Sequence, residues 1–414
     1  MKPKVIGAIE ITSCAVKYVV GYVLDGEVVV LKKAITPLDE KAVIDGEIHD
    51  SALVSKAISQ CVKEGDSALN DLINEYVVIV PPIGFEVFEH SQTTSVVSPV
   101  GKIAKLDIDN VLSQVSKART TDGSMIIDIL PDVYILDQGQ TQLDPPIGET
   151  SNSVTVKAKL HVLPIHLVQS HKKAYLQANV RYTKMLAAPY CALAIVKQSK
   201  NIPNDFILID LGAKMTTISL VGAKQVLAST FEYRGLDSIT EKLQKQFGID
   251  FKSAQQLKEL FGFDEQEYAF KAPLFTVVNK EKKEKRTINY ADWREAVGAS
   301  IHEFANELSY SIHELSTQIG APIQRLPMIF VGGGTRFHGL SEMLKEQLEC
   351  SDLRIITPTS LGARHPSFTN CLGAIQIIGS KKPIVDIEEE TPSSGGEKTR
   401  KIKTAKIDTL DDEL

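Results

Sequence analysis

Ile209-Asp210-Leu211-Gly212-Ala213-Lys214-Met215-Thr216-Thr217 and Val331-Gly332-Gly333-Gly334-Thr335 are the two stretches that decide the fold. Each continues a short apolar, β-branched run that predicts a strand. Glycines at the end of a strand let backbone N–H groups approach a phosphate or a nucleoside, because no Cβ stands in the way. A related turn lies near the N-terminus, at 8–14. Turns of this kind in distant parts of the chain predict a nucleotide cleft between two lobes.

Composition and charge argue against several other classes of protein. The chain has 414 residues, is 43% hydrophobic and carries a formal net charge of −6, so we expect about two to four domains and no nucleic-acid partner. Its five cysteines are scattered and never spaced as Cys-x-x-Cys, which favours a reducing cytosol over a disulfide framework or zinc site. The N-terminus lacks a signal-peptide pattern, and no apolar run approaches the roughly 20 residues that span a bilayer.

The order of predicted strands and helices indicates an α/β chain with an insertion. Short strands, a helix at 51–65 and a buried strand at 76–80 make up the first part. Roughly 84–163 then has the texture of a small inserted α+β domain. Its strands are expected at 125–130, 133–136 and 154–162. Later helices are expected at 165–178, 236–247, 254–260 and 293–318.

The C-terminal stretch has a different composition from the rest of the chain. From about residue 384 it is rich in Glu, Pro, Ser and Gly, which predicts a disordered linker. The final segment, 398–414, is first basic and then acidic. Its lysines and arginine could attract anionic lipid, whereas Asp411 to Glu413 would oppose this. Binding of the tail to a membrane and binding to a protein partner both stay open.

The repeated turns resemble those of the actin, Hsp70 and sugar-kinase superfamily. In that comparison 8–14 and 210–217 are the two phosphate loops, Gly332 to Gly334 form the adenosine motif, and 368–374 looks like the helix that links the lobes behind the cleft. The resemblance covers about residues 4–380.

Within the superfamily, the chain resembles the FtsA family of bacterial cell-division proteins. The most specific part is 129–162, where Leu130-Pro131, an aromatic-aliphatic strand, Asp144-Pro145-Pro146-Ile147-Gly148 and a final strand are similar to FtsA subdomain 1C, with one extra proline. The segments 235–240 and 254–258 also resemble FtsA motifs.

This resemblance implies an actin-like two-lobed ATPase fold, made of duplicated ribonuclease-H-like domains with an inserted α+β 1C subdomain. The implied boundaries are 1–83 and 164–200 for subdomain 1A, 84–163 for 1C, 201–235 for the first part of 2A, 236–327 for 2B, 328–383 for the rest of 2A and the return helix, and 384–414 for the linker and tail.

The resemblance also implies that ATP and Mg²⁺ bind in the cleft. Asp210 would hold Mg²⁺ through water, since Mg²⁺ retains several waters in proteins. Glu10 would lie near the γ-phosphate or the metal, so these two carboxylates are the candidate catalytic residues. The candidate nucleotide-binding residues are Thr12, Ser13, Gly212, Lys214, Thr216, Gln255, Lys258, Gly332, Gly333, Gly334 and Arg336.

Both phosphate loops depart from the family pattern. Glu10-Ile11-Thr12-Ser13 stands in place of Asp-Ile-Gly-Thr, and the Cβ of Thr12 would crowd a phosphate. In the second loop Lys214, Met215 and Thr217 replace Gly, Thr and Asp, and Lys214 could neutralise a phosphate. Gln255 replaces a family Glu. We therefore expect slow ATP hydrolysis at most.

The implied function is an ATP-binding, filament-forming scaffold of cell division. It would bind the C-terminal peptide of FtsZ through 236–327, other divisome proteins through the 1C subdomain, and further copies of itself. Its place would be the cytoplasm, peripheral on the inner face of the cell membrane at the division site. Three alternatives stay open: a PilM-like pilus-assembly scaffold, a degenerate FtsA relative that binds no nucleotide, and a small-molecule kinase of the same superfamily.

Overall fold

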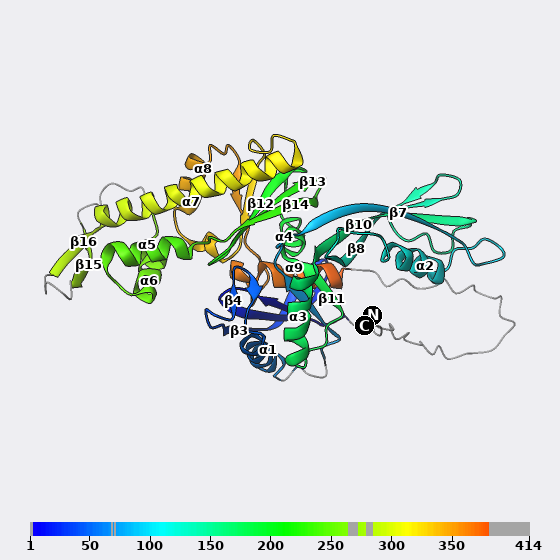
Figure 1. Cartoon of the computed structure of the whole chain (residues 1–414), viewed down its shortest axis with the longest axis horizontal. Coiled ribbons are helices and arrows are strands. Elements are labelled where there is room, and N and C mark those ends of the chain that lie inside the picture. The colour runs from blue at the N-terminus through cyan, green and yellow to red at the C-terminus, as the bar shows by residue number, and fades with distance from the viewer. Residues whose placement is uncertain (1–2, 68, 70–71, 264–271, 279–284, 381–414) are drawn as a thin grey trace. The chain divides into compact units, whose positions relative to one another are not determined.

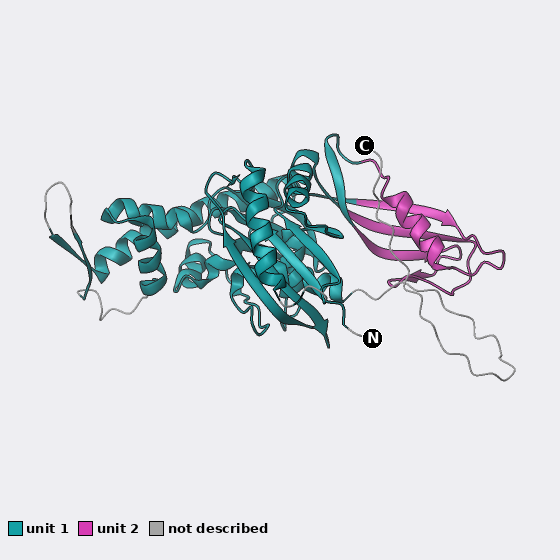
Figure 2. Ribbon diagram, turned by 90° about the horizontal axis from the view of Figure 1, so that it is seen from below, with its two compact units in different colours: residues 1–88, 120–128, 161–381 teal, residues 89–119, 129–160, 382–414 magenta. Residues whose placement is uncertain are grey.

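The computed structural model describes residues 3–67, 69, 72–263, 272–278 and 285–380, and the predicted linker and tail lie outside them. The chain divides into two compact units (Figure 2). Unit 1 comprises residues 1–88, 120–128 and 161–381, and its described part holds every candidate site residue. The described part of unit 2 comprises residues 89–119 and 129–160.

In the first sheet of unit 1 the central strand, β1, has the antiparallel strands β2 and β3 on one side and the parallel strands β6 and β11 on the other. Its order is β11-β6-β1-β2-β3. β1 pairs antiparallel with β2 and parallel with β6. All six residues of β1 are buried, as a strand covered on both faces requires. The strands are β1 (Ile6–Ile11), β2 (Ala15–Leu24), β3 (Glu27–Pro37), β6 (Glu75–Val80) and β11 (Lys184–Ala187).

Helices cover both faces of this sheet (Figure 1). Successive residues of β2 belong to different cores: Val20 packs in the cluster with residues of α1 and α3, whereas Val19 packs in the cluster with residues of α9. This follows from the two-residue period of a strand. The helices are α1 (Ser51–Asp66), α3 (Ile165–Gln177), α4 (Ala188–Val196) and α9 (Thr369–Gly379), and a small hairpin of β4 (Val43–Ile44) and β5 (Glu47–Ile48) precedes α1.

The second sheet of unit 1 repeats the topology of the first. Its order is β14-β13-β12-β17-β18, so that again a three-stranded meander is extended by two parallel strands. The predicted duplication is therefore present, and the α/β fold class is confirmed. The strands are β12 (Phe206–Leu211), β13 (Thr216–Gly222), β14 (Gln225–Glu232), β17 (Met328–Val331) and β18 (Leu353–Ile355).

A helical layer packs on the second sheet around a single core. The long helix predicted at 293–318 buries one face in this core, with Ile301, Phe304, Leu308 and Ile312 at helical spacing. Trp293 is also buried, and its Nε1 donates to the carbonyl of Gly262 over 2.9 Å. The elements are α5 (Asp237–Phe247), α6 (Phe251–Phe261), β15 (Pro273–Val278), β16 (Lys285–Asn289), α7 (Tyr290–Ile319) and α8 (Leu340–Gln347).

The described part of unit 2 contributes one helix and most of a sheet of order β7-β10-β8-β9. The prediction of separate strands at 125–130 and 133–136 was wrong, because β8 is continuous through Pro131. Its neighbour β9 pairs with Tyr134 and Ile135, beyond the proline, and a strand tolerates proline where one edge is unpaired. The elements are β7 (Glu86–Ser95), α2 (Lys105–Val115), β8 (Ser124–Leu136), β9 (Thr141–Gln142) and β10 (Ser153–Pro164). Within the described residues, no helix is long and apolar enough to cross a membrane.

Candidate functional site

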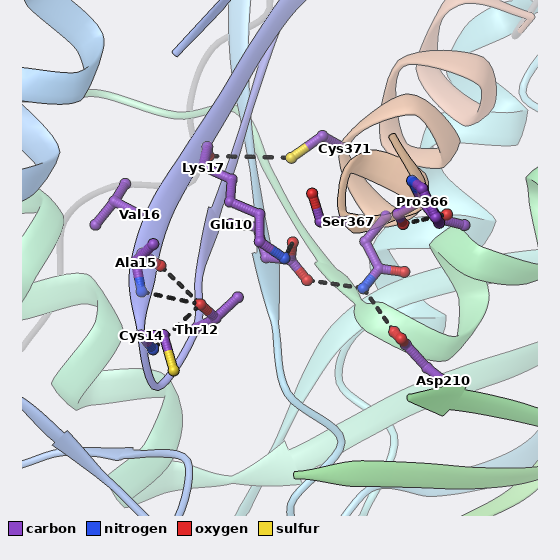
Figure 3. A network of polar contacts seen from close by, with 12 residues as sticks. Glu10, Thr12, Cys14, Ala15, Val16, Lys17, Asp210, Pro366, Ser367 and Cys371 are labelled. Carbon is purple, nitrogen blue, oxygen red and sulfur yellow. Dashed lines mark hydrogen bonds and ion pairs between the residues drawn. The ribbon is translucent and has the colours of Figure 1, made fainter. Parts of the chain in front are cut away.

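Two carboxylates meet where the corresponding strands of the repeated sheets end. Glu10 is the penultimate residue of β1 and Asp210 the penultimate residue of β12. Asn370, in the first turn of α9, joins them: its Nδ2 donates to Glu10 Oε1 over 2.7 Å and to Asp210 Oδ2 over 3.0 Å. Figure 3 shows these bonds as dashed lines. The structure therefore brings both candidate catalytic residues together.

Lys17 supplies a cation beside these carboxylates. It lies directly opposite Glu10 in the antiparallel pairing of β1 with β2, and its Nζ is 3.1 Å from Glu10 Oε2 (Figure 3). Burial lowers the pKa of Lys17, but the charges of Glu10 and Asp210 outweigh burial and leave this pKa raised. Lys17 is thus a firmly protonated partner of the acidic pair.

The charged form of Asp210 is destabilised by its surroundings. Burial raises its pKa above the ordinary aspartate value, and the nearby charge of Glu10 raises it further. The hydrogen bond from Asn370 and the charge of Lys17 act in the opposite direction. A cation beside Asp210 would stabilise its charged form and lower this pKa.

Thr12 closes the first loop on itself. Its Oγ1 donates to the carbonyl of Ala15 over 2.8 Å and accepts from the N–H groups of Cys14 and Ala15 over 3.4 and 3.2 Å (Figure 3). The threonine hydroxyl therefore occupies backbone donors that a glycine at this position would leave for a ligand.

The glycine-rich turn after β17 packs against the end of β12. Gly332 has φ +89°, and a Cβ built on it would lie 2.1 Å from Asp210 Oδ1. A Cβ on Gly334 would lie 2.9 Å from side-chain atoms of Leu211 and Leu236. These glycines are required for the close approach of the two turns, and residues Gly333–Arg336 then form a short 3₁₀ helix.

The helices after the second sheet present polar side chains from α5 and α6. Lys258 is only 4% exposed, and its Nζ donates to the carbonyl of Leu236 and to Thr240 Oγ1 over 2.9 and 2.6 Å. Burial lowers the pKa of Lys258 to about 8, although Asp237 opposes the shift. Gln255 accepts from Thr240 Oγ1 over 3.1 Å. The amine of Lys258 is thus anchored to the start of α5.

A cleft of about 340 Å³ collects these groups, a volume within the range of small-molecule sites. Of the predicted site residues, Thr216 does not line it, because this buried side chain donates to the carbonyl of Arg234 over 2.8 Å. Its neighbour Thr217 does line the cleft. The predicted residues that line it are Glu10, Thr12, Ser13, Asp210, Gly212, Lys214, Gln255, Lys258, Gly332, Gly333, Gly334 and Arg336.

The lining fits a magnesium nucleotide. Carboxylate and amide oxygens suit a hard divalent cation, and Mg²⁺ binds through one or two carboxylates while it keeps several waters. Among the described residues, no group of three or more His, Cys, Asp or Glu could hold a metal, so a cation here would rely on Glu10, Asp210 and water. Asn370 Oδ1 is buried and has no hydrogen-bond partner in the described part of the chain, and Lys17 and Lys214 supply positive charge for phosphates.

Sequence reasoning missed Lys17 and Asn370 as members of the site. Lys17 could have been found from the hairpin: a turn centred between Thr12 and Ala15 sets Lys17 opposite Glu10. Asn370 is 360 residues away from Glu10 along the chain; it belongs to the predicted lobe-linking segment 368–374, but no local pattern indicates that its amide reaches the carboxylates.

The sequence of this chain is similar to those of known cell-division proteins. The family model described as "Cell division protein FtsA" matches residues 207–373, which include the Asp210 turn, the Gly332 turn and Asn370. The chain resembles FtsA. It is 23% identical to the cell division protein FtsA of Streptococcus pneumoniae over 379 residues, which cover 90% of this chain and 79% of that FtsA. The predicted resemblance to FtsA is therefore confirmed.

Solved structures bear out the fold. A PilM-PilN type IV pilus biogenesis complex matches with a TM-score of 0.57 and 16% identity, covering 90% of this chain and 98% of that chain. MreB5 of Spiroplasma citri bound to AMPPNP matches with a TM-score of 0.51 and 10% identity, covering 90% and 95%. Together with the likeness to FtsA, they confirm the predicted actin-like fold.

Proposed function

We propose that this chain is an actin-like scaffold of cell division that binds ATP with Mg²⁺ in the cleft between Asp210 and Gly333. The observation that carries the proposal is the convergence of Glu10, Asp210 and the Gly332 turn on one cleft, in a chain that resembles FtsA. ATP would act as an assembly ligand that favours one conformation over another.

We assign the following roles to residues that line the cleft. Asp210 and Glu10 hold Mg²⁺, which would neutralise phosphate charge when bound. Lys17, Lys214, Ser13 and Gly212, which all line the cleft, would contact the phosphates. The Gly332 turn passes under the adenosine, and the residues on its ribose and base side are Gln255, Lys258 and Arg336.

Slow hydrolysis of ATP at most is part of the proposal. Thr12 already occupies two backbone donors of the first loop, and Lys17 already pairs with Glu10 over 3.1 Å. A group that is bonded in this way is poorly placed to orient an attacking water.

The partners follow from the likeness to FtsA. The layer of α5, α6 and α7, within subdomain 2B (236–327), would bind the C-terminal peptide of FtsZ, and the inserted 1C subdomain (84–163) would bind other divisome proteins. Further copies of the chain would join it in an actin-like filament. The tail would bring the protein to the inner face of the cell membrane at the division site.

A pilus-assembly scaffold is the second candidate, because the PilM-PilN complex shares the fold. Fluorescence anisotropy separates the two. We expect a labelled FtsZ C-terminal peptide to bind saturably, and neither a scrambled version of it nor a PilN peptide to do so. Preference for the PilN peptide would contradict the cell-division proposal.

The remaining candidates are separated by nucleotide assays. A small-molecule kinase would consume ATP only when a sugar or acid is added, whereas a scaffold would show the same low rate with and without such substrates. A degenerate relative would bind no ATP at all.

A further inference from the structure

A single side-chain amide stands between the two acidic residues of the cleft. Both hydrogens of Asn370 Nδ2 are used, one toward Glu10 Oε1 over 2.7 Å and one toward Asp210 Oδ2 over 3.0 Å. We call this arrangement the Asn370 bridge. It ties β1 of the first sheet to β12 of the second through the first turn of α9.

The NH₂ of Asn370 does what a cation would otherwise do, because it places positive partial charge between the two carboxylates. Two carboxylates in a buried site repel each other unless positive charge or hydrogen-bond donors lie between them. Glu10 has Lys17 as a second partner at 3.1 Å. The NH₂ of Asn370 is the donor that Glu10 and Asp210 share.

The carbonyl oxygen of the same side chain, Oδ1, is the atom that indicates a missing ligand. Asn370 is 6% exposed, and its Oδ1 is buried with no hydrogen-bond partner among the described residues. A buried, unpaired acceptor costs free energy. If the carboxamide turned over, Oδ1 would face Glu10 and Asp210, which is unfavourable unless a cation lies there too, because a cation takes amide and carboxylate oxygens alike.

We propose that the Asn370 bridge takes the place of a divalent cation when the cleft is empty, and that Asn370 turns to offer Oδ1 when Mg²⁺ enters. Without nucleotide, the NH₂ of Asn370 holds the two carboxylates in place, and when the metal is bound the same side chain offers Oδ1 to it. The inference rests on the proposed function only for the identity of the cation.

Replacement of the amide by a carboxylate tests this. Asn370→Asp removes the donor and adds an oxygen ligand at the same volume. Without nucleotide, and with EDTA present, we expect the Tm of the full-length Asn370→Asp chain to be about 5 °C or more below wild type, because three carboxylates then face one another. Addition of MgCl₂ alone should restore most of that loss, because the metal binds only the folded site. The wild-type Tm should change little.

Asn201→Asp is the matched control. Asn201 is exposed and its backbone is left-handed, a conformation that Asp tolerates. It adds the same charge outside the cleft, so its Tm should respond to MgCl₂ no more than wild type does. If MgCl₂ rescues Asn370→Asp no better than this control, or if wild type responds as strongly as Asn370→Asp, the proposal is overturned.

A measurement on the wild-type chain covers the case in which Asn370→Asp does not fold. Selective ¹⁵N-asparagine labelling gives a side-chain NH₂ signal for Asn370, assigned by its loss in Asn370→Ser. We expect slow solvent exchange of this NH₂ in the magnesium-free chain, and a shift with loss of protection when Mg²⁺ and ATP are added together. An unchanged signal at saturating Mg²⁺ and ATP contradicts the proposal. If wild type binds no ATP while Asn370→Asp still gains stability from MgCl₂, the proposed function fails and the Asn370 bridge stands.

Discussion

A Cβ on Gly332 would lie 2.1 Å from the Oδ1 atom of Asp210, so the absence of a side chain at one turn sets the position of the carboxylate at the other. Asp210 lies in β12 and Gly332 directly follows β17, and these two neighbouring parallel strands end at the same edge of the second sheet. Ligands bind at such edges of open α/β sheets. This relationship makes the glycine turn part of the acidic site as well as of the nucleoside side.

Gly332→Ala should therefore damage both stability and binding. The backbone at φ +89° and ψ 168° lies in a region that glycine alone adopts readily, which costs alanine about 1–3 kcal/mol, and the new Cβ must displace Asp210 or Leu211, which costs about 1–3 kcal/mol more. We expect urea unfolding to report a loss of about 3 kcal/mol, and the affinity for ATP with Mg²⁺ to fall at least roughly tenfold.

Gly248→Ala is the control for backbone strain alone. Gly248 also has a positive φ, +67°, but a Cβ there meets nothing within 4 Å. This variant should lose about 1 kcal/mol and bind ATP normally. Equal losses of stability and of binding in the two variants would show that crowding of Asp210 has no role.

Thr12→Gly should strengthen nucleotide binding while weakening the fold. The substitution frees the N–H groups of Cys14 and Ala15 that Thr12 Oγ1 now accepts. We expect about 1–2 kcal/mol less stability from the lost hydrogen bonds and added chain entropy, and roughly tenfold tighter binding of ATP by isothermal titration calorimetry. Thr12→Ser keeps the hydroxyl and should match wild type. Weaker binding by Thr12→Gly would argue that the threonine contacts the nucleotide itself.

The turns at the carboxyl ends of the strands could be predicted from the sequence, because each is marked by a pattern of neighbouring residues. The Asp210 and Gly332 turns each follow a short apolar strand, and glycine is needed where the backbone approaches another group closely. The stripe along α7 is equally local, since a helix repeats its buried face every three to four residues.

The contacts that complete the site could not be read in the same way. Lys258 is a predicted nucleotide-binding residue, and no local pattern predicts that its amine is anchored to Leu236 and Thr240, a consequence of how α6 packs on α5. The bond between Asn370 and Glu10 depends on the return of α9 to the first sheet after 360 residues. Thr216 is occupied by Arg234 of the following strand connection. Such contacts are set by tertiary packing, to which local patterns are blind.

The stability of the first lobe should fall in mild acid because of His171. Its side chain is 1% exposed and its Nδ1 donates to the carbonyl of Leu167 over 2.9 Å. Burial lowers the pKa of His171 from 6.5 to about 4. Between these values the unfolded chain binds more protons, so this stability is present above about pH 6.5 and is lost as the pH falls toward 4. A shift of this size corresponds to about 3 kcal/mol.

Urea unfolding of His171→Gln at a series of pH values checks this. The variant keeps a side-chain donor but cannot titrate, so its stability should fall less steeply between pH 6.5 and 4 than that of wild type. His49→Gln, at an exposed position, should keep the wild-type slope. A slope for His171→Gln identical to wild type would assign the acid sensitivity to other groups.

Calorimetric titration of the full-length chain with ATP and Mg²⁺, carried out on wild type and on Asp210→Ala, tests the central claim most directly. The account predicts saturable binding to wild type that EDTA weakens, and binding to Asp210→Ala that is at least roughly tenfold weaker because the metal has lost its carboxylate. Absence of binding to wild type, or equal affinity in the two proteins, would contradict the claim that Glu10, Asp210 and the Gly332 turn form a magnesium-nucleotide site.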